Sequence, residues 1–286
     1  MSIRRSSSDP GEVTVVIATR DRRSTLLTTL GRLTALPEAP PIIVVDNASR
    51  DGTAEVVRAA YPTVDIVTLA VNAGVAARNV GVRRAGTRLI AFSDDDSWWA
   101  PGALSRAADH FAAHRRLGLL GARVLVGAEE RLDPTSARMA LGPWHQGSPG
   151  PTIVGFVACG AVVRREAFLA VGGFEARFGI GAEEGLLAMD LAAAGWSLVY
   201  AEDVVAAHHP VQEPRPLRRR RVVRNELWTS WLRRPMPVAA RATLAALRPR
   251  LILGLLDAVH GIWWVARERR ALPASVERDL RRAQER

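Results

Sequence analysis

The chain has 286 residues, of which 48% are hydrophobic, and its formal net charge is +10, with all 39 basic residues being arginine. This length and apolar content exclude a wholly disordered chain and predict one large soluble domain with an appendage. The single cysteine, Cys159, excludes an intramolecular disulfide, favours a reducing, cytoplasmic setting and has no neighbour at metal-ligand spacing. Residues 1–11 are polar and serine-rich without an apolar core, which predicts a flexible tail and not a signal peptide.

The first third of the chain alternates β-branched runs with helix-forming segments. The expected strands are 13–18, 42–45 and 64–69, and the expected helices are 24–36 and 53–60. Ser24 is the expected cap of the first helix. Because parallel strands are joined through helices, this alternation predicts a mainly parallel sheet with helices on both faces.

A buried-type strand at 89–93 ends in three consecutive carboxylates, Asp94, Asp95 and Asp96. Adjacent acids repel one another unless a cation lies between them, and hard oxygen ligands suit Mg²⁺ or Mn²⁺. The end of a strand in an open α/β sheet is also where ligands bind. The residues therefore predict a divalent metal site, with a solvated acidic turn as the alternative.

Two loops before this strand also suit an anionic ligand. The turn at Asn72 and Gly74 precedes a helix, whose first N–H groups can face an anion, and Arg78 lies one turn further on. An ordinary strand-to-helix connection with a surface arginine is the alternative.

Trp98 and Trp99 follow the acids directly. Their large rigid faces suit a stacking wall for a ligand beside the acids, and packing against the sheet is the alternative for either one. A helix is expected over 101–114. The glycine- and proline-rich segment 127–152 is expected to be a functional loop.

The next expected elements are a strand over 154–163, a helix over 164–171, a helix starting near Glu183 and Glu184, and a strand over 197–201. Two adjacent glutamates at a helix start are favoured by the helix dipole, which is a sufficient structural reason for them. His208 and His209 follow the last strand, where one member of the pair is expected to be functional.

From Gln212 onward the chain becomes basic and amphipathic. An arginine run precedes apolar residues at helical spacing over 227–232, and a second apolar helix is expected over 251–266. That second run is too short to span a bilayer comfortably. Two interpretations of this region are open. Residues 213–270 contact an anionic membrane, or the helices pack onto the main domain or form a dimer. Nucleic acid is not required by the charge.

The ordered set of motifs VTVVIATRDR, VVDNASRDGT, NAGVAARNVG and FSDDDSWWAPG resembles the family 2 glycosyltransferases, which have the nucleotide-sugar-binding GT-A fold. The resemblance covers about 12–210. It implies an α/β GT-A domain over 12–212, after the tail at 1–11 and before a basic helical C-terminal region over 213–286.

The resemblance also implies roles for single residues. Asp46 matches the acid that holds the nucleobase or ribose. The carboxylates of Asp94, Asp95 and Asp96 match the DxD element, with Asp96 the expected direct ligand of Mn²⁺ or Mg²⁺. The expected contacts to the donor nucleotide and its diphosphate are Thr19, Arg20, Asn72, Gly74 and Arg78.

In the second half, Glu184 matches the catalytic base, with Glu183 as the other candidate, and His208 matches a ligand of the metal or diphosphate. The segment Gln212–Pro216 lacks the tryptophan of the processive members' Gln-x-x-Arg-Trp motif, which favours transfer of a single sugar. The resemblance implies transfer with inversion at the sugar's anomeric carbon. Trp98 and Trp99 are then candidates for the sugar pocket, and the segment 127–152 is a candidate loop beside the acceptor.

The implied partners are a UDP-, dTDP- or GDP-sugar and a hydroxyl acceptor on a glycan, a lipid-linked saccharide or a secondary metabolite. The expected location is the cytoplasm, with the inner face of the cell membrane as an option. A nucleotidyltransferase of similar fold and a non-catalytic binding module remain as alternatives. The loop at 19–23 lacks the glycine-rich, lysine-bearing sequence of nucleotidyltransferases.

Overall fold

The computed structural model describes residues 12–210 and 217–284. The expected tail at 1–11 and the Gln212–Pro216 segment lie outside the described residues. Within them, the predicted alternation of strands and helices in the first third is confirmed. Its elements are β1 (Val13–Thr19), α1 (Arg23–Thr34), β2 (Ile42–Asp46), α2 (Thr53–Ala60), β3 (Asp65–Thr68), the 3₁₀ turn η1 (Gly74–Ala76), α3 (Ala77–Arg84) and β4 (Leu89–Ser93).

The sheet is parallel in this first part and mixed beyond it. Strands run in the order β3-β2-β1-β4-β8-β6-β9-β5, and β1 is parallel to both β2 and β4. The second part adds β5 (Ser97–Trp99), α4 (Ala103–Ala113), β6 (Leu117–Val126), β7 (Arg131–Leu132), α5 (Pro134–Ala140), β8 (Ala161–Arg164), α6 (Arg165–Ala170), η3 (Ala176–Phe178), α7 (Glu183–Ala193) and β9 (Ser197–His208). Strand β8 is antiparallel to both β4 and β6, which joins the two parallel parts into one sheet.

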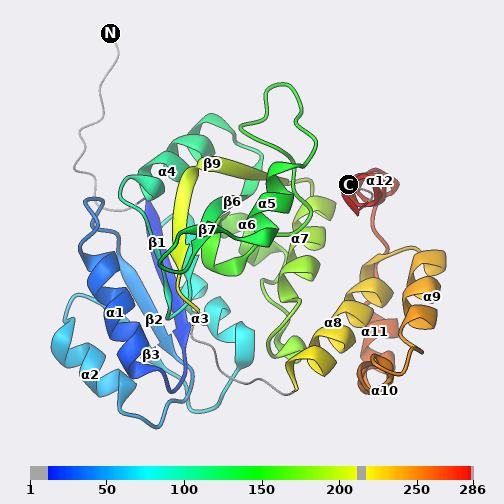
Figure 1. Cartoon of the computed structure of the whole chain (residues 1–286), viewed down its shortest axis with the longest axis horizontal. Coiled ribbons are helices and arrows are strands. Elements are labelled where there is room, and N and C mark those ends of the chain that lie inside the picture. Colours follow the sequence, from blue (N-terminus) through cyan, green and yellow to red (C-terminus); the bar gives the residue numbers. More distant parts are fainter. Residues whose placement is uncertain (1–11, 211–216, 285–286) are drawn as a thin grey trace.

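Helices cover both faces of the sheet (Figure 1), and an apolar cluster is buried on each face. The alternation along β1 sends Val15 and Ile17 into the layer shared with α1 and α4, and Val16 into the layer shared with α3, α6 and α7. Because both faces are buried, the strand is apolar from Val15 to Ala18, without polar alternation, as expected for a parallel sheet.

Two boundaries differ from those expected at the sequence level. Helix α1 begins at Arg23 and not after a Ser24 cap, because the backbone N–H of Arg23 is already satisfied by the Asp51 carboxylate, 3.0 Å away. Strand β9 continues to His208, past the expected end at residue 201. A register shift against β6 accommodates the polar residues that suggested an end there.

The expected loop at 127–152 contains regular structure. Its helix α5 has a complete start signal, with Pro134 in the first turn and the Asp133 carboxylate accepting the N–H groups of Thr135 and Ser136. The hydroxyl of Ser136 donates to Ala122 O of β6 at 3.2 Å, which fixes this helix to the sheet. The prediction of an irregular segment is therefore wrong for 131–140.

Within the described residues 217–284, the helices are α8 (Arg218–Arg233), α9 (Met236–Ala245), α10 (Ile252–Val259), α11 (Ile262–Glu268) and α12 (Ala274–Gln284). The single helix expected over 251–266 is broken at Gly261. A Cβ at Gly261 would lie 2.7 Å from the Trp228 ring, so the glycine permits α11 to turn back onto α8.

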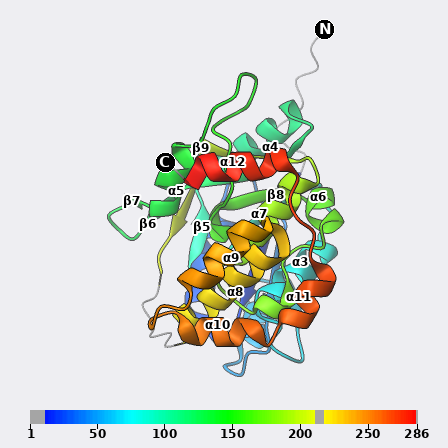
Figure 2. The same cartoon turned by 90° about the vertical axis from the view of Figure 1, so that its right-hand side faces the viewer.

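A third apolar cluster joins these helices to the main domain. Phe178 and Leu186 of the domain pack with Leu227 and Trp228 of α8. Figure 2 shows the helices as a layer stacked on this side of the molecule. Docking onto the domain, one of the two options left open by the sequence, is therefore observed. Among the described helices we find none with the length and apolarity needed to cross a bilayer.

Candidate active site

A cavity of about 1190 Å³ opens at the carboxyl ends of the parallel strands. Its walls come from the loops after β1, β3 and β4, from the segment around η3 and from the start of α8. The expected residues that line it are Thr19, Arg20, Asn72, Gly74, Arg78, Asp94, Asp95, Asp96 and His208. Residues from distant parts of the sequence thus meet at one edge of the sheet, where the topology predicts a ligand site.

The turn after β4 holds its three carboxylates in three different environments. The Asp94 side chain is 33% exposed and forms a short ion pair with Arg78. The carboxylate of Asp95 accepts the Thr19 hydroxyl at 2.9 Å. Burial raises the pKa of Asp95 to about 6, even though Arg22 and Thr19 lower it. The Asp96 carboxylate lies 3.3 Å from His208 Nε2. Because Asp95 and Asp96 are buried and each of the three carboxylates has a side-chain partner, the acids do not form a solvated turn.

Arg22 supplies the local positive charge. Its guanidinium lies 3.2 Å from Asp95 and 3.3 Å from Asp96. Arg22 was not among the predicted site residues, because in the sequence it is one of several arginines in a polar loop. Only the pairing of β1 with β4 shows that this loop faces the acids.

His208 reaches the same place from the end of β9. Burial lowers its pKa, but the hydrogen bond to Asp96 and the charges of nearby acids outweigh burial, and the pKa is raised. Ligand atoms of Asp94, Cys159 and His208 lie within 4.8 Å of one another. Cys159, which has no metal-ligand neighbour in sequence, is therefore beside a metal-ligand group in space.

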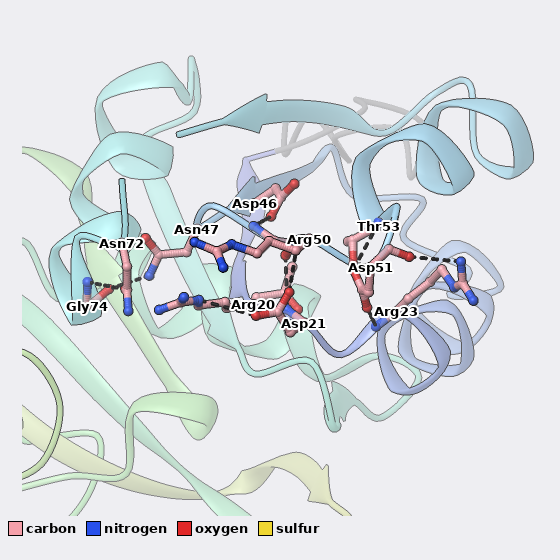
Figure 3. A network of polar contacts seen from close by, with 12 residues as sticks. Arg20, Asp21, Arg23, Asp46, Asn47, Arg50, Asp51, Thr53, Asn72 and Gly74 are labelled. Carbon is pink, nitrogen blue, oxygen red and sulfur yellow. Dashed lines mark hydrogen bonds and ion pairs between the residues drawn. The ribbon is translucent and has the colours of Figure 1, made fainter. Parts of the chain in front are cut away.

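The loops after β1 and β2 hold each other in place, as Figure 3 shows. The Asp21 carboxylate accepts the N–H of Arg50 at 2.6 Å. Asp46 is 2% exposed, and its carboxylate accepts the N–H of Ser49 at 3.0 Å. Among the described residues around the cavity, Asn47 and not Asp46 represents this loop. The Asp46 carboxylate thus stabilises the turn after β2, and Asp46 does not line the cavity.

The turn at Gly74 is held by close backbone contacts. Asn72 accepts the Gly74 N–H at 2.9 Å, and Asn47 donates to Gly74 O at 3.1 Å (Figure 3). Gly74 has φ +59°, and a Cβ there would lie 2.4 Å from Gly179 O. Glycine is required here because the backbone of η1 touches the η3 segment.

Arg78 connects the acids of the first half to the two glutamates of the second. Burial lowers its pKa, but the charges of Asp94, Glu183 and Glu184 outweigh burial, and the pKa is raised. Glu183 is 4% exposed and its carboxylate accepts the Gly181 N–H. Burial and the neighbouring Glu183 raise the pKa of Glu184 to about 7. Neither glutamate is among the described residues that line the cavity. The charges of both act on Arg78, and Glu184 also interacts with Asp94.

The two tryptophans pack against the protein. Trp99 is 1% exposed and belongs to the core. The Trp98 ring lies 4.7 Å from the His209 ring, with the Arg32 guanidinium 5.5 Å from it. Packing in the core, the alternative to a stacking wall, is therefore observed for Trp99. Trp98 contacts Arg32 of α1 and His209, which directly follows β9.

The basic start of α8 faces the cavity, a position that the sequence analysis had not foreseen. Arg218, Arg221 and Arg224 recur at helical spacing and line the cavity wall. The Arg224 guanidinium donates to Phe178 O at 2.8 Å, whereas Arg218 and Arg221 form no ion pair with any acid in the described ranges. Part of the positive charge of the C-terminal region thus belongs to the site.

Residues 14–172, more than half of the chain, match the family model described as glycosyl transferase family 2. The chain belongs to glycosyltransferase family 2. This glycosyltransferase is 26% identical over 219 residues to an N-acetylglucosaminyl-diphospho-decaprenol L-rhamnosyltransferase of Mycobacterium tuberculosis, an alignment covering 63% of this chain and 70% of that protein. It is 30% identical over 105 residues to the succinoglycan biosynthesis protein ExoU of Rhizobium meliloti, covering 35% of this chain and 31% of that one.

Solved structures show the same fold. The mannosyltransferase PcManGT from Pyrobaculum calidifontis, in complex with GDP-Man and Mn²⁺, matches with a TM-score of 0.59 at 19% identity, covering 96% of this chain and 86% of that chain. S. aureus TarS 1-349 in complex with UDP-GlcNAc matches with a TM-score of 0.60 at 16% identity, covering 76% and 65%. The glycosyltransferase has the GT-A fold expected from its motifs, and its family sets aside the nucleotidyltransferase alternative.

Proposed function

We propose that this glycosyltransferase moves one sugar, with inversion, from a nucleotide diphosphate sugar to an acceptor hydroxyl. The observation that carries the proposal is the position of Arg78, which pairs with Asp94 and interacts electrostatically with Glu183 and Glu184. A guanidinium between these acids could stabilise the negative charge of a departing diphosphate while a glutamate beside it acts as the base. The donor is a UDP-, dTDP- or GDP-sugar, supported by the GDP-Man and UDP-GlcNAc bound to the structural neighbours.

The residues present fit a divalent cation. The imidazole of His208 lies 3.3 Å from the Asp96 carboxylate and within 4.8 Å of a carboxylate oxygen of Asp94, and oxygen ligands with one imidazole suit Mn²⁺. A bound Mn²⁺ or Mg²⁺ would offset the negative charge of the departing diphosphate. Arg22, paired with Asp95 and Asp96, would orient these two carboxylates.

Glu184 is the proposed base. The Glu183 carboxylate already accepts the Gly181 N–H, whereas Glu184 is half-buried with a pKa of about 7, near the value that suits a general base at neutral pH. Glu184 would take the proton of the acceptor hydroxyl as that oxygen bonds to the anomeric carbon. The bond from this carbon to the diphosphate breaks on the opposite side, and the diphosphate leaves with the electron pair.

We propose a lipid-linked saccharide as the acceptor, in cell-wall or polysaccharide biosynthesis. The support is the name of the Mycobacterium tuberculosis relative, whose acceptor is N-acetylglucosaminyl-diphospho-decaprenol. Such an acceptor would place the enzyme in the cytoplasm, at the inner face of the cell membrane.

The donor site is tested by thermal unfolding with a panel of nucleoside diphosphates, with and without Mn²⁺. A ligand stabilises only the state that binds it, so the correct nucleotide at about 100 times its Kd should raise Tm by roughly 5 °C or more. Asp96→Ala should abolish the part of the shift that depends on Mn²⁺. Asp109→Ala, on the exposed side of α4, is the matched control. A wild-type protein that no nucleotide stabilises would contradict the proposal.

A further inference from the structure

The C-terminal helices carry apolar residues on two opposite faces. Toward the domain, Leu255 and Ala258 of α10 and Val265 of α11 are buried against α8. On the outside, α10 exposes Leu253, Leu256 and Val259, of which 55%, 52% and 52% are accessible. Apart from Asp257, α10 is made of apolar residues and glycine, and only its face toward α8 has an apolar environment.

The outward residues form one stripe. Leu253, Leu256 and Val259 are spaced three apart and therefore share a face of α10. Trp263 follows at the start of α11 with 83% of its surface exposed. We call Leu253, Leu256, Val259 and Trp263 the outer stripe. Leu244, near the end of α9, and Leu247, just after it, are also exposed, with 65% and 55% of their surface accessible.

The polar residues around the outer stripe are positively charged. Arg241, Arg248, Arg250 and Arg267 are exposed on or between these helices. The only two acids between Met236 and Glu268 are already paired: Asp257 with Arg220, and Glu268 with Arg177 at 2.8 Å. Within Met236–Glu268, the charges outside these two ion pairs are therefore all positive.

We propose that the outer stripe docks this enzyme onto an anionic lipid bilayer. Apolar side chains on short helices with arginine at their borders suit the interface of a membrane that contains acidic lipids, and an exposed tryptophan suits the headgroup level. A protein partner of this shape would need a complementary acidic rim. The last helix provides an internal contrast, because its exposed residues, among the side chains that the structure describes, include Arg278, Arg281 and Arg282 and no large apolar side chain.

Docking in this way would bring the cavity to the membrane surface. Helix α8 joins the two features: Arg221 lines the cavity, and its neighbour Arg220 pairs with Asp257 inside α10. In Figures 1 and 2, α10 lies alongside α8 on the side of the molecule away from β1 to β3. An acceptor held by a lipid could then reach the cavity without leaving the bilayer.

The test is co-sedimentation of the full chain with two kinds of vesicle, one of pure phosphatidylcholine and one of equal parts phosphatidylcholine and phosphatidylglycerol. The wild-type protein should bind the anionic vesicles at least about tenfold more tightly, and added salt should weaken this binding. Leu256→Asp and Trp263→Asp should each reduce it at least about tenfold. Arg248→Glu with Arg250→Glu should remove the preference for anionic lipid.

Two control variants match these changes. Trp144 is 68% exposed in the loop after α5, and Trp144→Asp should leave vesicle binding unchanged. Arg115→Glu with Arg116→Glu, on the exposed turn after α4, should do the same. The assay needs neither nucleotide nor acceptor, so its result is independent of the proposed transfer reaction.

Three results would overturn the docking proposal. One is equal or negligible binding of the wild-type protein to the two vesicles, and another is full binding by Trp263→Asp. The third is a wild-type dimer that ignores vesicles and becomes a monomer in Trp263→Asp, measured by sedimentation velocity, since the outer stripe would then be a self-association surface.

Discussion

Glu184 illustrates how the surroundings of one residue can set its chemistry. Two adjacent glutamates begin α7, yet Glu183 is tied to the Gly181 N–H while Glu184 keeps a pKa near 7. The backbone brings them there through a left-handed Ala182, with φ 60°, directly before the helix. A non-glycine residue in this conformation costs energy and is often found at functional sites.

We therefore expect Glu184→Gln to lower the transfer rate by about 10²- to 10⁴-fold while nucleotide binding is kept. In the wild type, the base must be unprotonated, so the rate should rise with pH up to about 7 and level off above it. Initial rates across this pH range and nucleotide titrations check both points. Glu183→Gln is the comparison, and a Glu184→Gln enzyme with normal turnover would disprove the assignment.

At the scale of elements, the contact between η1 and the η3 segment holds the cavity together. Gly74 lies against Gly179, and the Val75 N–H donates to Gly179 O at 2.5 Å. This contact joins the loop that precedes α3 to the loop that precedes α7. Helix α3 carries Arg78, and helix α7 carries Glu184. The distance between the proposed diphosphate contact and the proposed base therefore depends on it.

Gly74→Ala should lower the free energy of unfolding by roughly 1–3 kcal/mol, because the new Cβ meets a backbone oxygen and the residue has a positive φ. Nucleotide affinity should fall as well. The matched control is Gly86→Ala, where a Cβ has no neighbour within 4 Å. Urea unfolding and nucleotide titration of both variants decide the point, and equal stability of the two would exclude a structural role for the Gly74 contact.

At the scale of the whole molecule, a buried ion pair anchors the last helix. Arg234 Nε, after α8, lies 2.7 Å from Glu277 of α12, and both side chains are only 7% exposed. Burial raises the pKa of Glu277, but the hydrogen bonds from Arg234 and Arg281 outweigh burial, and the pKa is lowered. The pair should thus stabilise the fold at neutral pH and lose this effect as the pH falls through the lowered pKa.

Glu277→Ala should lower the free energy of unfolding by about 3–5 kcal/mol, because it leaves the buried Arg234 guanidinium without this carboxylate. The control is Asp279→Ala on the same helix, where the carboxylate is exposed and a change within about 0.5 kcal/mol is expected. Denaturant unfolding at neutral and acidic pH measures both. A loss that did not shrink at acidic pH would argue against the ion pair as its cause.

Local sequence signals were enough to predict the strands and helices of the first half, a mainly parallel sheet and the motif positions. β-branched runs and turn residues are such signals, and the buried strands of a parallel sheet carry them strongly. Thr19, Asn72, Arg78 and the three aspartates accordingly lie at one cavity, as their motifs indicate.

Which side chains are in contact at this cavity depends on the tertiary structure. The Thr19 hydroxyl and the Asp95 carboxylate are 76 residues apart in sequence, and Arg22, Cys159 and the arginines of α8 are brought to the site by strand pairing and helix docking alone. The same holds for Trp99, which the core buries, and for α10, whose two apolar faces have different neighbours. Local periodicity specifies that a face is apolar. What covers that face depends on contacts between segments that the chain brings together only on folding.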